Sequence, residues 1–88
     1  MAYLERRNQS ENMARFYRVS IEPDLFGGVA IVRRWGRIGT DGRELRTWHP
    51  DAGQAEILAD RAVAAKRRRG YAEPQAPLRS AWGVSGRC

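Results

Sequence analysis

The stretch that decides the fold is residues 29–48, VAIVRRWGRIGTDGRELRTW. It opens with β-branched residues over 29–35, which predict a strand. Asp41-Gly42 is a strong signal for a hairpin turn, so residues 43–48 are expected to return as an antiparallel strand. Gly36 interrupts the pattern and predicts a bend or bulge, with a short separate strand over roughly 36–39.

The segments on either side extend this sheet and add one helix. Residues 14–21, ARFYRVSI, alternate apolar and polar side chains and predict a half-buried strand. Asp51 is suited to cap a helix over about residues 51–69, which Gly70 would end. The apolar face expected to pack on the sheet comprises Ala55, Leu58, Ala59, Ala62 and Val63. The expected fold class is therefore α+β, an antiparallel sheet of about four strands with one C-terminal helix on one face.

The two ends of the chain lack clear periodicity. Residues 1–12 are expected to form a disordered leader, residues 13–73 the folded domain, and residues 74–88 a flexible basic tail.

Composition argues against several function classes. Apolar residues make up 42% of the 88, and no apolar run reaches the roughly 20 residues of a membrane span, so we expect a cytoplasmic protein without membrane contact. The single cysteine, Cys88, and the single histidine, His49, leave too few ligands for a structural zinc site. The sequence has neither a nucleophile motif nor a phosphate loop. We expect no metal, no cofactor and no enzymatic activity.

Positive charge is the main functional indication. Sixteen basic and ten acidic residues give a net charge of +6, which favours polyanionic partners. Residues 33–39, RRWGRIG, place three guanidinium groups and one indole close together. Guanidinium groups bind phosphate in a bidentate manner, and an indole can stack on a base. Two interpretations of Trp35 remain open at this point: it lies in the core, or it lies at a binding surface.

The tripeptide Trp35-Gly36-Arg37, followed by Ile38-Gly39, resembles the signature of the WGR domain. The resemblance extends to Phe16-Tyr17, the loop at 24–28, Lys66 and Gly70-Tyr71, and so covers residues 13–73. It is nearest to the short standalone bacterial members of that family. The resemblance implies an antiparallel sheet with a packed helix. It also implies DNA binding, in which Trp35 packs on a terminal nucleotide and Arg37 supports the contact, as in poly(ADP-ribose) polymerases.

These observations together lead us to expect a nucleic-acid-binding module without base specificity, with DNA favoured over RNA. The expected contact residues combine the central cluster with the basic end of the helix: Trp35, Gly36, Arg37, Arg33, Arg34, Lys66, Arg67 and Arg68. The alternative is a protein–protein interaction module that uses the same surface, because Trp and Arg are also common at the centres of protein interfaces.

Overall fold

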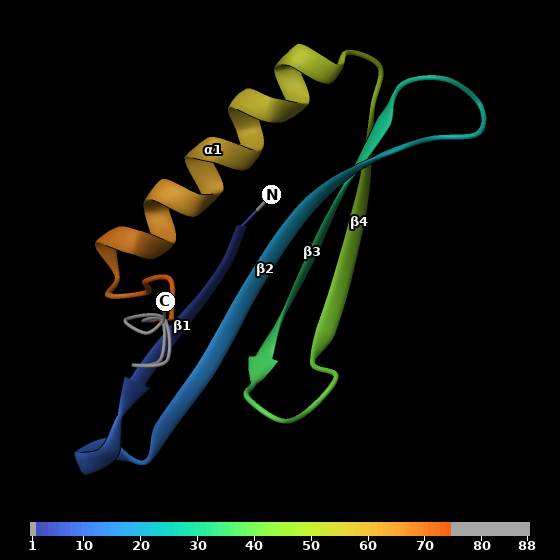
Figure 1. Cartoon of the computed structure of the whole chain (residues 1–88). Helices are drawn as coiled ribbons and strands as arrows, with labels where there is room; N and C mark the ends of the chain where they lie inside the picture. The colour runs from blue at the N-terminus through green and yellow to red at the C-terminus, as the bar shows by residue number, and fades with distance from the viewer. Residues whose placement is uncertain (1, 75–88) are drawn as a thin grey trace, which may run out of the picture.

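The computed structural model describes residues 2–74, which form a four-stranded antiparallel sheet with one helix on one face (Figure 1). The strands follow one another across the sheet in chain order. They are β1 (Ala2–Asn8), β2 (Met13–Pro23), β3 (Val29–Arg37) and β4 (Arg43–His49), with a short 3-10 turn, η1 (Gln9–Glu11), after β1. The helix α1 (Ala52–Arg68) follows β4. The expected α+β fold class is confirmed.

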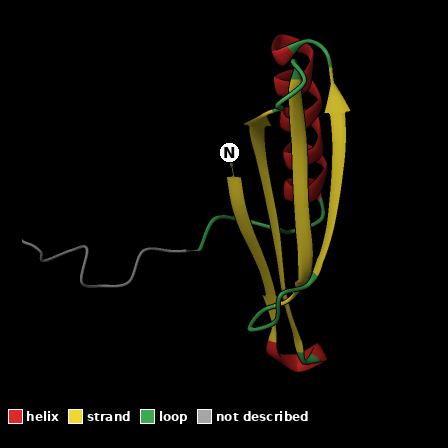
Figure 2. Cartoon of the chain, turned by 90° about the vertical axis from the view of Figure 1, so that its right-hand side faces the viewer, coloured by secondary structure: helices red, strands yellow, loops and turns green. Residues whose placement is uncertain are grey.

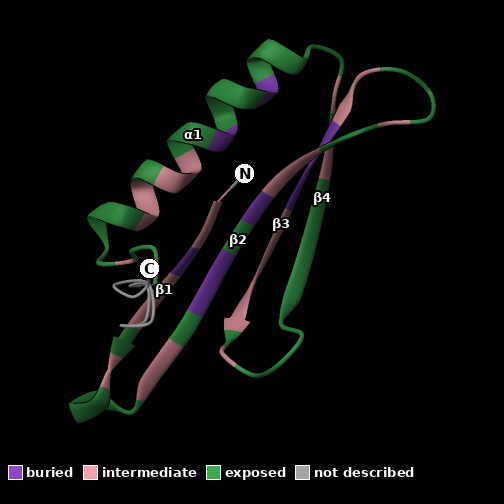
Figure 3. Cartoon of the chain, viewed as in Figure 1, coloured by how far each residue is buried: buried purple, intermediate pink, exposed green. Residues whose placement is uncertain are grey.

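The core lies between α1 and the face of the sheet that the helix covers (Figure 3). Its buried side chains come from the three strands β1, β2 and β3 and from the helix: Leu4, Tyr17, Val19, Ile31, Ala55 and Ala59. Because side chains alternate along a strand, the remaining residues of each strand point to the other face. We call these the helix side and the open side of the sheet.

The expected disordered leader is wrong, because residues 2–8 form the edge strand β1. This strand pairs with β2 in the register Ala2↔Val19 to Asn8↔Met13, and Leu4 is completely buried. Its outer edge is also paired at one position, where the backbones of Glu5 and Ala72 exchange two hydrogen bonds of 2.7 and 2.9 Å. The segment has only two apolar residues on its inner face, so local pattern alone did not reveal a strand that depends on its neighbour. The expected tail, apart from Pro74, lies outside the described residues.

The separate strand expected over 36–39 is also wrong. β3 continues through Gly36 to Arg37 without a bulge, in regular register with β2. The turn over residues 38–42 then leads to β4, so the Asp41-Gly42 signal marks the hairpin correctly. The Cα atom of Gly42 packs so closely on Gly36 that a Cβ at residue 36 would lie only 2.7 Å from it. The glycine in β3 therefore makes room for the turn, which folds over the open side.

The helix begins and ends where the sequence indicates. The Asp51 side chain accepts a hydrogen bond from the Gly53 amide and caps the first turn. At the other end, the amides of Gly70 and Tyr71 donate to the carbonyls of Arg67 and Lys66, and Gly70 has a φ of +99°. This pair of bonds is a Schellman motif, which glycine favours because it tolerates positive φ.

One member of the expected helix face is placed wrongly. Leu58 is 41% exposed, whereas Ala55 and Ala59 are buried and Ala62 and Val63 are partly buried. Successive residues are about 100° apart around a helix, so when Ala59 faces the sheet directly, Leu58 is turned to its flank. Small alanine side chains then form the centre of the contact.

The helix is too short to cover the sheet. Its 17 residues span about 25 Å, whereas the 11 residues of β2 span about 36 Å. In both Figure 1 and Figure 2 the strands continue well past the last turn of α1. The helix side of the sheet is therefore uncovered at the end that carries η1 and the β3–β4 turn.

Candidate nucleic-acid interface

A row of three arginines crosses the uncovered end of the helix side. Arg6 on β1 pairs with Arg15 on β2, and Arg15 pairs with Arg37 on β3. Directly paired residues project from the same face, and neighbouring strands lie about 4.8 Å apart, so the row spans roughly 10 Å. Like charges in this arrangement repel one another and destabilise the sheet. The row is thus costly for folding and well arranged for a ligand with several negative charges.

The next row towards the helix is aromatic. Tyr17 pairs with Trp35, and Trp35 pairs with Arg43. Trp35 is half-buried and packs against the core, so the structure places it between the two interpretations that the sequence left open. It lines a pocket of about 330 Å³ between the sheet and the last turns of α1, together with Tyr17, Arg33, Leu45, Ala62, Ala65, Lys66 and Arg69.

Two cations in this pocket lie in unusual surroundings. The Nε atom of Arg33 is buried and has no hydrogen-bond partner among the described residues. The Nζ atom of Lys66 lies 5.0 Å from the centre of the Tyr17 ring and 5.2 Å from that of Tyr71, within range of two cation–π contacts. Burial first, and then the charges of Arg69 and Arg15, lower the pKa of Lys66.

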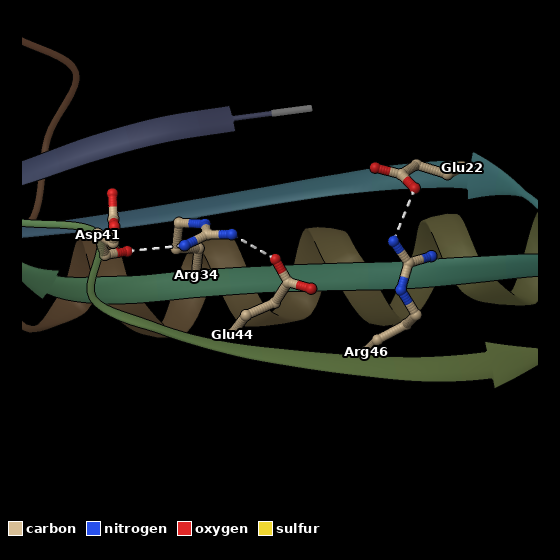
Figure 4. A network of polar contacts seen from close by, with 5 residues as sticks. All are labelled: Glu22, Arg34, Asp41, Glu44 and Arg46. Carbon is tan, nitrogen blue, oxygen red and sulfur yellow. Dashed lines mark hydrogen bonds and ion pairs between the residues drawn. The ribbon is translucent and has the colours of Figure 1, made fainter.

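The acidic residues of the strands all lie on the open side of the sheet. The three ion pairs between sheet residues are Arg7–Glu5, Arg34–Glu44 and Arg46–Glu22, and register places all six residues on the open side. Figure 4 shows the last two pairs, with Arg34 also donating to the backbone oxygen of Asp41. Within residues 2–74, no strand contributes an acidic residue to the helix side.

We define the basic face as the helix-side cluster at this end, comprising Arg6, Arg15, Arg33, Trp35, Arg37, Arg43, Lys66 and Arg69. In the part of the chain that is described, none of its cations forms an ion pair with a carboxylate. Arg37 donates a single long hydrogen bond of 3.4 Å, to the backbone oxygen of Asn12. Its guanidinium group therefore keeps most of its donors free.

The basic face includes only part of the site expected from the sequence. It brings together Trp35, Arg33, Arg37 and Lys66. Arg34 lies on the opposite side in its ion pair with Glu44, because adjacent strand residues point to opposite faces. Gly36 has no side chain to offer a ligand, and its role is to let Gly42 of the turn pack closely on β3.

Of the three expected residues in the last turn of the helix, only Lys66 belongs to the basic face. Arg67 forms a two-bond ion pair with Glu73, which occupies its guanidinium group, and this contact raises the pKa of Arg67 and lowers that of Glu73. Arg68 is exposed, and it is not among the residues that line the pocket.

Four residues of the basic face were not expected from the sequence: Arg6, Arg15, Arg43 and Arg69. Arg15 could have been found, since it alternates in phase with Tyr17 and Val19 on the same strand. Arg6 could not, because the pattern of its segment did not indicate a strand. The alignment of the arginine row depends on strand register, which the sequence pattern does not determine.

Comparison with known proteins places the chain in a family. The profile of the WGR domain family matches residues 1–77. The chain belongs to the WGR domain family. This WGR domain is also similar to an uncharacterized protein, y4dW, of Sinorhizobium fredii (strain NBRC 101917 / NGR234), with 45% identity over 69 residues. The match covers 78% of the chain but only 34% of that relative, so the domain spans about a third of the relative's length. No solved structure matches.

Neither a membrane-spanning helix nor a metal cluster is found among the described residues. Over residues 2–74, α1 is neither long nor apolar enough to cross a membrane. The same residues contain no cluster of three or more His, Cys, Asp or Glu side chains that could hold a metal ion.

Proposed function

We propose that this WGR domain binds nucleic acid through the basic face, with DNA as its main ligand. The observation that carries the proposal is the row Arg6–Arg15–Arg37, on a face to which no strand within residues 2–74 contributes a carboxylate. Planar guanidinium groups match the oxygens of phosphate, and several in a row suit a phosphate backbone. The energy lost to repulsion in the free protein is regained when phosphates neutralise the row.

The aromatic row above the arginines supports a second type of contact. Trp35 is half-buried, so the exposed part of the indole offers apolar contact to a sugar or the edge of a base beside the phosphates. Arg43, paired with Trp35, extends the positive surface to the edge strand β4. We assign phosphate binding to the arginines and nucleoside contact to Trp35.

This binding is expected to be independent of base sequence. Most cations of the basic face project from the sheet as guanidinium groups suited to phosphate oxygens, and phosphate contacts carry no base information. Competition between labelled and unlabelled duplexes of unrelated sequence tests this expectation. A preference beyond about a hundredfold for one sequence would contradict it.

Titration of a labelled duplex at a series of salt concentrations tests the proposed function itself. If the row and Arg43 each contact one phosphate, these four arginines predict that log K falls against log salt concentration with a slope of about −3 to −4 for a duplex. Single-stranded and nicked DNA of the same sequence, titrated in parallel, identify the preferred form.

The alternative, a protein-interaction module, makes a different prediction in the same experiment. Leu45 is 45% exposed beside Trp35, so apolar contact with a protein partner would use the same pocket. Such binding changes little with salt, because it depends on burial of apolar surface. If no DNA form binds at low salt, or if binding does not change with salt, phosphate recognition by the basic face is refuted.

A further inference from the structure

The outer edge of β4 has no backbone partner among the described residues. The opposite edge strand, β1, is paired at one position, by the backbone bonds between Glu5 and Ala72. β4 has seven residues, and five of them, Arg43–Arg46 and Trp48, are exposed. Open edges of this length present unpaired backbone donors and acceptors, and they pair readily with another strand.

Symmetry restricts how β4 could pair with a second copy of itself. Two antiparallel copies in one continuous sheet are related by a two-fold axis perpendicular to the sheet. Residues that face each other then lie on the same side of the sheet, so the axis must pass through a residue paired with its own copy. The candidates near the middle of the strand are Glu44, Leu45, Arg46 and Thr47.

The charges of β4 favour Leu45 on the axis. An axis at Glu44 or Arg46 would place identical charges directly opposite each other, which is destabilising. An axis at Thr47 would bring no opposite charges together. With Leu45 on the axis, Glu44 of each copy faces Arg46 of the other, and the two half-exposed Leu45 side chains meet on the helix side.

The existing ion pairs leave room for this contact. Arg34 donates to one carboxylate oxygen of Glu44, so the second oxygen is available. Arg46 uses one terminal nitrogen for Glu22, and its other donors are available (Figure 4). Pairing would thus join Arg34, Glu44, the second copy's Arg46 and the second copy's Glu22 in one network, twice per dimer.

We propose that this WGR domain forms a symmetric dimer through β4, with Leu45 on the two-fold axis. The two sheets then form one sheet of eight strands. Both helices and both basic faces lie on the same side, because the axis is perpendicular to the sheet. The dimer stands independently of the proposed function. Only its consequence, a positive surface of double length for one DNA duplex, rests on nucleic-acid binding.

Sedimentation of the full chain in the absence of DNA tests the dimer, so its outcome is separate from that of the DNA titrations. One strand pair buries a small interface, so the dimer is expected to be weak and to appear as concentration rises towards about 1 mM. A chain that remains monomeric throughout this range overturns the proposal.

Charge exchange tests the contact itself. Glu44→Arg alone would place arginines opposite Arg46, and Arg46→Glu alone would place glutamates opposite Glu44, so each variant should be monomeric. Mixed together, they restore two opposite-charge pairs, and the mixture should regain the dimer mass. Circular dichroism of each variant confirms the fold. If either single variant dimerises as the parent does, or the mixture remains monomeric, the proposed contact is wrong.

Cross-linking tests the register. In a Cys88→Ser background, Leu45→Cys should form a disulfide-linked dimer under mild oxidation, since paired Cα atoms lie about 4.5–5.5 Å apart. Arg43→Cys is the matched control on the same side of the same strand. In this register the two copies of residue 43 lie roughly 14 Å apart, too far for a disulfide. Equal cross-linking of both variants overturns the Leu45 register.

Discussion

Gly42 occupies a position that only glycine fits. Its φ is +71°, and a Cβ there would lie 2.3 Å from the Trp35 carbonyl oxygen and 2.9 Å from the Phe16 ring. Gly39, in the same turn, also has a positive φ of +95°, but a Cβ there would meet nothing within 4 Å. An alanine at residue 39 would therefore introduce backbone strain alone, whereas an alanine at residue 42 would introduce both strain and steric overlap.

We therefore expect Gly42→Ala to lower the free energy of unfolding more than Gly39→Ala does. Positive φ alone costs about 1–2 kcal/mol, and overlap in a packed turn adds about 1–3 kcal/mol. Chemical denaturation of both variants measures the difference. Equal losses would show that the turn relaxes around the added methyl group.

Lys66 gives a prediction with a defined pH dependence. Because burial and neighbouring cations lower its pKa in the folded chain, the unfolded chain holds this proton more tightly. Stability should therefore rise as pH increases through the lowered pKa towards the unfolded value of 10.5.

The variant Lys66→Met removes the titrating ammonium group while keeping a side chain of similar length. The parent should gain stability relative to Lys66→Met as pH rises towards 10.5. Tyr3 and Tyr17 make the opposite contribution in both proteins, because burial raises their pKa values. Thermal melts over this pH range measure the stability difference between the two proteins. A parent that loses stability relative to the variant would contradict a lowered pKa for Lys66.

At the scale of the elements, β1 is an integral part of the domain. Leu4 is fully buried beneath the helix, so Leu4→Ala should cost about 2–5 kcal/mol of unfolding free energy. Leu58→Ala is the matched control, because the same substitution at a 41% exposed position should cost less than about 1 kcal/mol. Denaturation midpoints that reverse this order would restore the expectation drawn from the sequence.

The sequence predicted most elements but not their pairing. Alternation found β2, and the capping residues Asp51 and Gly70 located both ends of α1, since these signals depend on local chemistry. β1 was missed because its pattern becomes clear only beside β2. Arg34 was grouped with Arg33 and Arg37 because closeness in sequence does not distinguish the two faces of a strand.

At the scale of the whole molecule, charge is distributed by face. The ion pairs of the sheet lie on the open side, and the unpaired cations of the basic face lie on the helix side at the uncovered end, within the described residues. A net charge of +6 spread evenly would attract DNA to every surface alike. The proposed function requires instead that DNA binds at the basic face and not at the open side.

Two cross-strand arginine pairs between β2 and β3 allow a matched comparison. Arg15 and Arg37 face each other on the helix side, and Arg18 and Arg34 face each other on the open side. Replacing either pair with glutamine lowers the net charge by two at the same two strands. Circular dichroism and thermal melts establish that both double variants are folded.

Titration of one labelled duplex with both double variants over a series of salt concentrations tests the central claim most directly. Arg15→Gln with Arg37→Gln should weaken binding at least about tenfold and make the log–log salt slope shallower by about two units. Arg18→Gln with Arg34→Gln should leave the slope nearly unchanged. Equal effects of the two double variants, or a larger effect from the open side, would contradict binding through the basic face.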